Sequence, residues 1–457
     1  MKMRIRFEQR DPVSGDAAQA TTPEFGYSVP STRPPVHLKR FYFFSITNVT
    51  FMQCTLGGTL FGLYMAELGL NPARIGMLVA LFPFMQILSL GGGLLAERMG
   101  FRRAFLLFFG SRKIAVMALA AAPWVVSWGS ELASFLYVAT FVSLFGILRS
   151  LGETALFPWQ KEFIPDLFRG RVLGTASMSA AAASIIGMVI VAFIVESGQR
   201  TDWGHFLPYQ MAFLFFPLLA LSGVIGTRHL PGGEKSTERK TSSAFYQGLF
   251  HSLRDRKFRL FLTADGMIMG CSFLFLGLMP VYMKSVIGIP SSKIVLLGAM
   301  LMAGGILGGF YVGRVTEGLQ SRKLIVRLLI GMSCLPVLWM LLPELGRWRI
   351  PGAFFVYFCS GFVGTSLAIC VVRLLFNEIL PERGKTEYLS VRYAFCGLVA
   401  GMFPLIGGKS TSWFSEINGT FAGIQFTPFL PAFFACSMAW ILCAFVFLQI
   451  NTDDSAS

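Results

Sequence analysis

Residues 93–103 read Gly-Leu-Leu-Ala-Glu-Arg-Met-Gly-Phe-Arg-Arg, a short charged segment that lies between two long apolar runs. The flanking runs, at 73–96 and 104–127, are each longer than 20 residues and contain no acidic side chain. About 20 apolar residues in a helix cross the roughly 30 Å hydrocarbon core of a bilayer. The segment is therefore predicted to be a loop that joins two membrane-spanning helices.

Similar apolar runs recur along the whole chain of 457 residues, of which 54% are hydrophobic and only 14% are charged. A soluble protein of this length would divide into several domains with polar surfaces, which this composition excludes. The sequence predicts an all-α membrane protein with twelve transmembrane helices. The predicted spans are 41–66, 73–96, 104–127, 132–155, 171–195, 208–228, 259–283, 291–313, 324–342, 351–376, 388–410 and 429–450.

A polar, basic stretch between the sixth and seventh spans divides the chain into two halves of six spans each. No cleavable signal peptide is expected, because the first apolar run is too long for one. The predicted organisation is a cytoplasmic N-terminal tail at 1–36, a six-helix bundle at 37–228, a cytoplasmic linker at 229–258, a second six-helix bundle at 259–450 and a C-terminal tail at 451–457.

Basic residues gather in alternate loops, so the net charge of +15 is a topology signal and no nucleic-acid partner is expected. Of the 39 Lys and Arg residues, 29 are assigned to the two tails, the linker and the loops on the same side, Arg112 and Lys113 among them. Seven lie in the opposite loops, and three lie within spans. Because cytoplasmic loops carry the excess of positive charge, both termini are expected to be cytoplasmic, in a bacterial inner membrane.

The two halves repeat each other in two features. Glycines followed by a basic loop occur at 91–103, after the second span, and again at 308–323, after the eighth. The fourth and tenth spans each carry an arginine, Arg149 and Arg373, followed by a proline, an acidic residue and a basic run. Internal repeats of this kind are how many secondary transporters are built, which predicts two pseudo-symmetric bundles.

At residues 93–103 the chain resembles the major facilitator superfamily, whose loop between spans two and three reads Gly-x-Leu-(small)-Asp-Arg-x-Gly-Arg-Arg. Glu97 replaces the usual Asp, and Phe101 replaces the first Arg of the basic run. The resemblance covers about residues 37–450. It implies the fold of that family and the transport of a small organic solute by alternating access, with no enzyme activity and no cofactor, and it names no substrate.

Charged residues near the cytoplasmic surface are interpreted as a gate, because ion pairs there can form and break between two conformations. The alternatives are that the loop charges only anchor the topology and that the charges in spans snorkel to lipid headgroups. Asp265 and Arg392, about two turns inside their spans, are open to either reading. The predicted cytoplasmic gate consists of Gly93, Glu97, Arg98, Gly100, Arg102, Arg103, Arg149, Glu153, Arg373 and Glu378.

Neutral polar side chains inside the spans are the candidates for solute binding, and they suit an uncharged polar or amphipathic molecule. The alternative is that these groups bond neighbouring helices or their own backbone. No Asp, Glu or His lies in the middle of a predicted span, which favours a facilitator, or a carrier coupled to a proton or cation through the cytoplasmic-side carboxylates. The candidate solute-binding residues are Asn48, Gln53, Thr55, Gln86 and Thr365.

The eight cysteines all lie in apolar runs without CxxC spacing, so neither a disulfide nor a zinc site is expected. No metal-ligating or nucleophilic motif is present, so an enzyme is disfavoured. The remaining alternative to a solute carrier is a non-transporting membrane sensor or assembly partner on the same scaffold. The expected partners are the lipid bilayer and a small solute, and the protein is expected to be monomeric.

Overall fold

The computed structural model describes residues 38–128, 131–164, 169–200, 205–234, 242–315, 321–381, 385–415, 420–421 and 424–450. They belong to one compact unit, which runs from Val36 onward, and the predicted tails at 1–36 and 451–457 lie outside them. Almost all of these residues are helical, as the apolar runs predict. The strands among the described residues form a short antiparallel hairpin, in which β1 (Thr420–Phe421) pairs with β2 (Ile424–Gln425).

The first half is built from nine α-helices, because two of its predicted spans are interrupted and a third ends in a separate short helix. The helices are α1 (Leu38–Gln53), α2 (Thr59–Glu67), α3 (Pro72–Phe84), α4 (Ser89–Met99), α5 (Phe101–Ala118), α6 (Ala122–Trp128), α7 (Glu131–Phe163), α8 (Arg169–Arg200) and α9 (Leu207–Gly226). In the described residues, three short helical turns join or extend them: η1 (Met85–Leu88), η2 (Leu119–Ala121) and η4 (Thr227–His229).

The second half follows a short helix in the linker region. Its elements are α10 (Ser242–Arg254), α11 (Arg256–Ser285), α12 (Ser291–Val315), α13 (Ser321–Leu341), η5 (Leu342–Trp348), α14 (Arg349–Leu374), the π-helical η6 (Leu375–Ile379), α15 (Lys385–Trp413) and α16 (Leu430–Gln449).

Ten helical stretches in the described residues are long and apolar enough to cross a membrane. One of them, residues 322–379, contains both α13 and α14. The first predicted span is absent from the ten because it is broken into α1 and α2, and neither piece is long enough alone. The architecture is thus an all-α membrane fold that is consistent with the twelve predicted spans.

The break in the first span is built from glycine. Helix α1 ends at Gln53, and the next residues form turns until α2 begins at Thr59. A Cβ atom on Gly58 would overlap the carbonyl oxygen of Gln53, so no larger residue fits this bend. The second predicted span bends at η1, which follows Pro83, because proline cannot donate the helical backbone hydrogen bond. Both interruptions lie close to the interface between the two halves.

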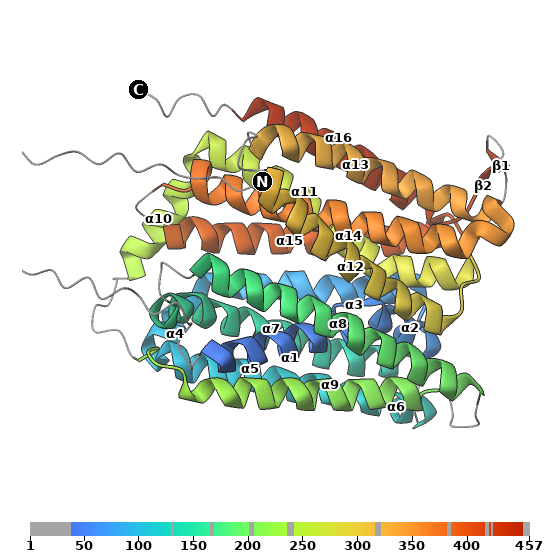
Figure 1. The fold of residues 1–457 in the computed structure, drawn as a ribbon, viewed down its shortest axis with the longest axis horizontal. Coiled ribbons are helices and arrows are strands. Elements are labelled where there is room, and N and C mark those ends of the chain that lie inside the picture. The colour runs from blue at the N-terminus through green and yellow to red at the C-terminus, as the bar shows by residue number, and fades with distance from the viewer. Residues whose placement is uncertain are drawn as a thin grey trace, which may run out of the picture. The chain divides into compact units, whose positions relative to one another are not determined.

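The helix pairings of the first half recur in the second, which is the pseudo-symmetry that the sequence repeats predict. The first span packs on the fifth (α1 on α8), as the seventh packs on the eleventh (α11 on α15). The third packs on the sixth (α5 on α9), as the ninth packs on the twelfth (α13 on α16). The halves meet through α3 against α15 and α8 against α12, and they occupy the lower and upper parts of Figure 1.

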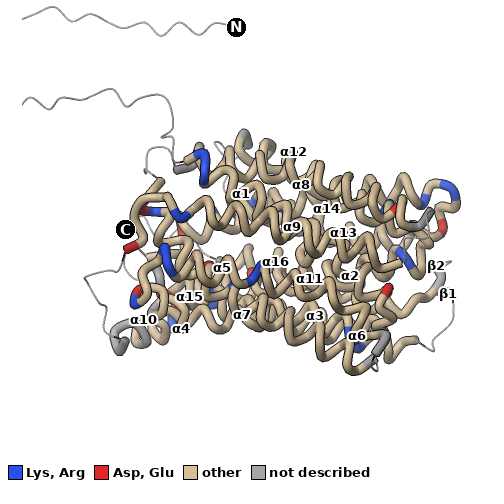
Figure 2. The backbone as a smooth tube through the Cα atoms, turned by 90° about the horizontal axis from the view of Figure 1, so that it is seen from below, with Lys and Arg blue, Asp and Glu red and all other residues tan. Residues whose placement is uncertain are grey.

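Charged residues concentrate at the two ends of the helical unit, and few lie along its middle (Figure 2). One end carries α4 and α10, and the other carries the β1–β2 hairpin; they are called the α10 end and the hairpin end below (Figure 1). Part of the region predicted to be a plain linker, 229–258, is helix α10, which packs against α15 with Gly248 close to the side chain of Glu387.

Candidate functional site: a cavity between the two halves

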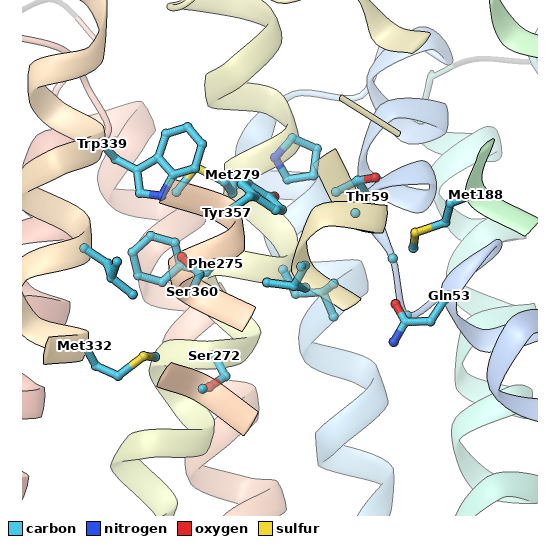
Figure 3. A pocket seen from close by; sticks show the side chains of 18 of the residues that line it. Gln53, Thr59, Met188, Ser272, Phe275, Met279, Met332, Trp339, Tyr357 and Ser360 are labelled. Carbon is cyan, nitrogen blue, oxygen red and sulfur yellow. The ribbon is translucent and has the colours of Figure 1, made fainter. Parts of the chain in front are cut away.

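A cavity of about 260 Å³ lies between the two halves, next to the break in the first span (Figure 3). In Figure 3, Gln53, Thr59 and Met188 line one side, and side chains of α11, α13 and α14 line the other. The cavity is lined by Gln53, Gly57, Gly58, Thr59, Met188, Ser272, Phe275, Leu276, Met279, Pro280, Gly298, Leu301, Met332, Leu335, Trp339, Tyr357, Ser360, Gly364 and Trp440.

The polar groups of this lining are few, and none of the described lining residues is charged. The amide of Gln53 makes no side-chain hydrogen bond within the described residues, so it is free to bind a ligand. The hydroxyl of Ser360 donates to the backbone of its own helix at 2.7 Å, which leaves its oxygen able to accept a hydrogen bond. The indole N–H of Trp440 has no hydrogen-bond partner in the described part of the chain.

Aromatic and methionine side chains are prominent in the wall on the second-half side. Phe275 stacks on Trp440 with ring centroids 5.6 Å apart and an interplanar angle of 13°. Trp339 packs edge-on against Tyr357 at 5.3 Å. Three methionines also line the cavity, Met188 from the first half and Met279 and Met332 from the second, and their flexible side chains adapt to irregular shapes. This arrangement suits a molecule with a flat apolar part and a few uncharged polar groups.

The two halves contact each other at the hairpin end. Lys284 of α11 pairs with Glu67 of α2 at 2.6 Å, and the Tyr209 hydroxyl lies 3.5 Å from the same carboxylate. Nearer the cavity, the hydroxyl of Thr59 donates to the carbonyl oxygen of Ile294 at 3.3 Å. A Cβ atom on Gly62 would lie 3.1 Å from the ring of Pro280, so the helices approach closely here.

Of the five candidate solute-binding residues, only Gln53 lines this cavity. Asn48 accepts hydrogen bonds from two buried cations. Thr55 is fully buried and donates to the carbonyl oxygen of Phe51 at 2.6 Å, which is the alternative role that the sequence left open. Gln86 lies on η1 against Gly397 of α15. Thr365 lines a separate, open hollow along α14.

Sequence reasoning missed the aromatic wall of the cavity. Trp339 and Trp440 lie on the ninth and twelfth spans, where a buried aromatic side chain reads as ordinary core. The only available signal was that Trp is rare, at eight residues in the chain, and carries a polar N–H that a buried site must satisfy.

Within the described residues, the predicted gate residues form no ion pair that joins the two halves, although Arg149 and Glu153 lie near Tyr393 of α15. Arg149 and Glu153 pair with each other at 2.7 Å, and their side chains are 24% and 27% exposed. Glu378 lies near Arg373 on the same side of the second half. Among the described residues, no ion pair joins the loop charges Glu97, Arg98, Arg102 and Arg103 to the second half.

The loop itself is positioned by backbone contacts. Gly100 separates α4 from α5 with φ of 90°, a left-handed conformation that favours glycine. The backbone N–H of Arg102 donates to the carbonyl oxygen of Gly233 at 3.0 Å, which ties the loop to the chain that follows α9. Gly93, the first residue of the predicted gate, lies inside α4 with space around it.

The assignment of Arg112 and Lys113 to a cytoplasmic loop is wrong. Both lie within α5, where they are 1% and 0% exposed. They are packed among phenylalanine rings, with the guanidinium carbon of Arg112 3.7 Å from the centroid of Phe109 and the Lys113 ammonium 3.8 Å from that of Phe51. The aromatic faces supply the attraction that makes burial tolerable. The signal was present, since the predicted span 104–127 already contained both residues.

Asp265 and Arg392 neither pair with the loop charges nor snorkel to headgroups, the two readings considered for them. They form an ion pair with each other at 2.7 Å between α11 and α15, and their side chains are 1% and 9% exposed. The Cys396 thiol lies 3.4 Å from the same carboxylate oxygen. The two residues are 127 positions apart, so no local sequence pattern predicts the pair.

A family model for the Major Facilitator Superfamily matches residues 43–404 of the chain. No curated protein matches the chain in sequence. The three solved structures described next are 14–16% identical to the chain, and a likeness at this level shows the fold alone.

The D-xylose-proton symporter is 15% identical, with a TM-score of 0.66 over 92% of this chain and 98% of that chain. A bacterial homologue of the human lysosomal transporter Spinster, in an inward-facing and occupied conformation, is 14% identical, with a TM-score of 0.63 over 92% of this chain and 97% of that chain. The nucleoside transporter NupG is 16% identical, with a TM-score of 0.60 over 91% of this chain and 99% of that chain.

Proposed function

Because the chain belongs to the Major Facilitator Superfamily, we propose that it is a secondary transporter that carries an uncharged amphipathic organic solute by alternating access. The observation that carries the choice of solute is the central cavity, whose described lining has no charged side chain. An ionised solute would lose its hydration there without gaining a counter-charge, which costs several kcal/mol or more. A neutral one would lose much less.

The proposed solute lies with its flat part against Trp339, Tyr357 and Phe275, and its polar groups reach Gln53 and the Trp440 indole N–H. Gln53 belongs to the first half and the aromatic residues belong to the second. A solute held between the halves therefore interacts with both, and its contacts change when they move. This differential contact is what a carrier needs in order to couple binding to a change of conformation.

Alternating access requires each end to open in turn. We propose that the Lys284–Glu67 contact closes the hairpin end in this conformation and breaks when that end opens. The gate at the other end is proposed to be formed by the charged residues of the 93–103 loop together with Arg149, Glu153, Arg373 and Glu378. Their ion pairs would join the two halves in the opposite conformation, in which the hairpin end is open.

We propose that the α10 end faces the cytoplasm of a bacterial cell and that the protein works as a monomer. Support for the orientation comes from the basic residues, which remain strongly concentrated on that side after Arg112 and Lys113 are removed from the count. Transport is proposed to be facilitative, or driven by a proton or cation gradient through Glu153 and Asp265. Asp265 is buried between α11 and α15, and Glu153 lies on α7 beside Arg149.

The function is tested by solute binding and uptake. Thermal unfolding of the detergent-purified protein is followed against neutral nucleosides, glycosides and aromatic compounds, with organic acids and amines as charged counterparts. A saturable stabilisation by one neutral class is expected, followed by uptake of that solute into proteoliposomes. If only ionised solutes bind, or if a bound solute is never taken up, the proposal is wrong.

Gln53→Leu is expected to weaken binding of the identified solute about tenfold, because a hydrogen bond in the cavity is worth about 1 to 1.5 kcal/mol. Thr365→Val is the matched control, since Thr365 lies outside the cavity and should leave affinity unchanged. Affinity is measured by titrating the solute against intrinsic tryptophan fluorescence. Equal affinities in both variants would remove Gln53 from the site.

Lys284→Gln is expected to speed opening at the hairpin end, because it removes the ion pair with Glu67. A partly exposed pair is worth up to about 1 kcal/mol, which corresponds to a roughly fivefold shift in population. The measurement is the rate at which a membrane-impermeant maleimide labels a Thr59→Cys variant, with the native cysteines as background. Lys409→Gln, an exposed lysine at the same end, should leave the rate unchanged, and acceleration in both would point to a general charge effect.

A further inference from the structure

Two adjacent cations are buried inside the first half, away from the central cavity. Arg112 and Lys113 are 1% and 0% exposed, and neither lines the cavity. Both donate to the same atom, the Oδ1 of Asn48, at 2.5 Å and 2.7 Å. One amide oxygen is thus shared by an arginine guanidinium and a lysine amino group.

No carboxylate lies within hydrogen-bond distance of this cluster in the described residues. Arginine and lysine together carry eight N–H bonds in their charged groups, and the acceptor that they share in the described residues is one amide oxygen. The Nε of Arg112 is buried and has no hydrogen-bond partner in the described residues. Glu153 is the carboxylate that acts on Arg112, but it is already paired with Arg149 at 2.7 Å. In their charged forms, the two groups are costly to bury without an anion in direct contact.

We propose that Arg112, Lys113 and Asn48 bind a small inorganic anion. The N–H groups of the two cations are the donors, and Arg112 Nε is the donor left vacant in the structure. The phenylalanine rings beside them supply a dry surround in which a charge pair is strong. The site is separate from the solute cavity, so it does not rest on the identity of the solute.

The cluster is connected to the solute cavity through α1. Asn48 lies on this helix, and Gln53, which lines the cavity, is its last residue before the glycine bend. Phe51, between the two, packs under the Lys113 ammonium. An anion that fixes Asn48 and Lys113 therefore also restrains the end of α1. Since linkage is reciprocal, anion occupancy and solute binding should alter each other's affinity.

The test is thermal unfolding of the full-length detergent-purified protein at constant ionic strength, with sodium gluconate replaced stepwise by sodium chloride or by sodium phosphate. A saturable rise in Tm of about 2 °C or more is expected with one or both probes. A response to phosphate alone would identify the ligand as an oxyanion. If neither probe gives a saturable shift that gluconate does not give, the proposal is overturned.

Variants locate the effect. Lys113→Gln and Arg112→Gln are expected to abolish the anion-dependent rise in Tm, whereas Arg103→Gln, which removes an exposed cation from the same helix, should keep it. An undiminished rise in Lys113→Gln would place the anion elsewhere and contradict the proposal.

Asn48→Asp keeps the test decisive if the glutamine variants do not fold. Asp has nearly the shape of Asn and would place a fixed carboxylate between the two cations. This variant is expected to unfold at a higher Tm than the wild type in gluconate and to lose the response to chloride and phosphate. If it keeps the full response, the cluster is not the anion site.

Discussion

Asp265→Leu is expected to lower the free energy of unfolding by about 3–5 kcal/mol, because it leaves the Arg392 guanidinium buried without a counter-charge. The carboxylate is 1% exposed and lies 2.7 Å from Nε of Arg392. Water therefore does not replace the hydrogen bond that the guanidinium loses. The measurement is chemical or thermal unfolding of the purified protein in detergent. This is the largest effect expected of a single charge in the described residues.

The double variant Asp265→Leu with Arg392→Met should recover most of that loss, since a buried ion pair can be replaced by apolar side chains at little cost. Glu153→Ala is the matched control, because the side chains of the Arg149–Glu153 pair are 24% and 27% exposed. Its expected cost is at most about 1 kcal/mol. A single Asp265 variant as stable as the wild type would mean that Arg392 finds another partner or water.

The same variants distinguish a structural role of the Asp265–Arg392 pair from a role in coupling transport to a proton gradient. If the double variant is stable and still transports down a solute gradient but no longer responds to a proton gradient, the Asp265–Arg392 pair takes part in proton coupling. If it transports with an unchanged response, the pair only holds α11 against α15. Either outcome can be read in proteoliposomes once the solute is known.

Gly304→Leu is expected to prevent folding or to cost at least about 3 kcal/mol, because α12 and α14 pack backbone against backbone at this point. A Cβ atom on Gly304 would overlap the carbonyl oxygen of Phe358, and one on Gly361 would overlap that of Leu301. Such an overlap is with rigid helix backbone, so it cannot be relieved by rotating a side chain. The measurement is the yield of monodisperse protein and its Tm in detergent.

Gly309→Ala is the control on the same helix, because a Cβ atom there would lie 3.8 Å from the Ile369 side chain, an ordinary contact. It should leave stability within about 0.5 kcal/mol of the wild type or raise it slightly. If Gly304→Leu folds normally, the two helices must be able to separate. That would make the α12–α14 contact a place where the second half flexes.

Small residues recur at every fourth position of the fifth span, a pattern that predicts close helix packing. They are Thr175, Ser179, Ala183 and Gly187. In the structure Thr175 is exposed, whereas a Cβ atom on Gly187 would lie 2.8 Å from the Thr50 side chain. The stripe is thus tight at one end only. The closest backbone approaches are made by α12 and α14, where glycines of two helices face each other.

The sequence by itself determined the class of fold, because crossing a bilayer is a local property of about 20 consecutive residues. The charged loop at 93–103, the repeats around Arg149 and Arg373 and the polar break after the sixth span were enough to predict two related bundles. The family follows from the same residues. None of these inferences depends on how a helix is rotated about its own axis.

Only the tertiary structure decided which side chains meet, because the rotation and depth of each helix are set by packing against helices far away in the chain. Asp265 and Arg392 meet across 127 positions, and the cavity combines Gln53 with Trp339 and Trp440 from other spans. The predicted span 104–127 already contains Arg112 and Lys113, but only the structure shows that Asn48 and the phenylalanine rings surround them. The class of fold therefore follows from local stretches of sequence, whereas the candidate binding sites are formed by contacts between residues far apart in the chain.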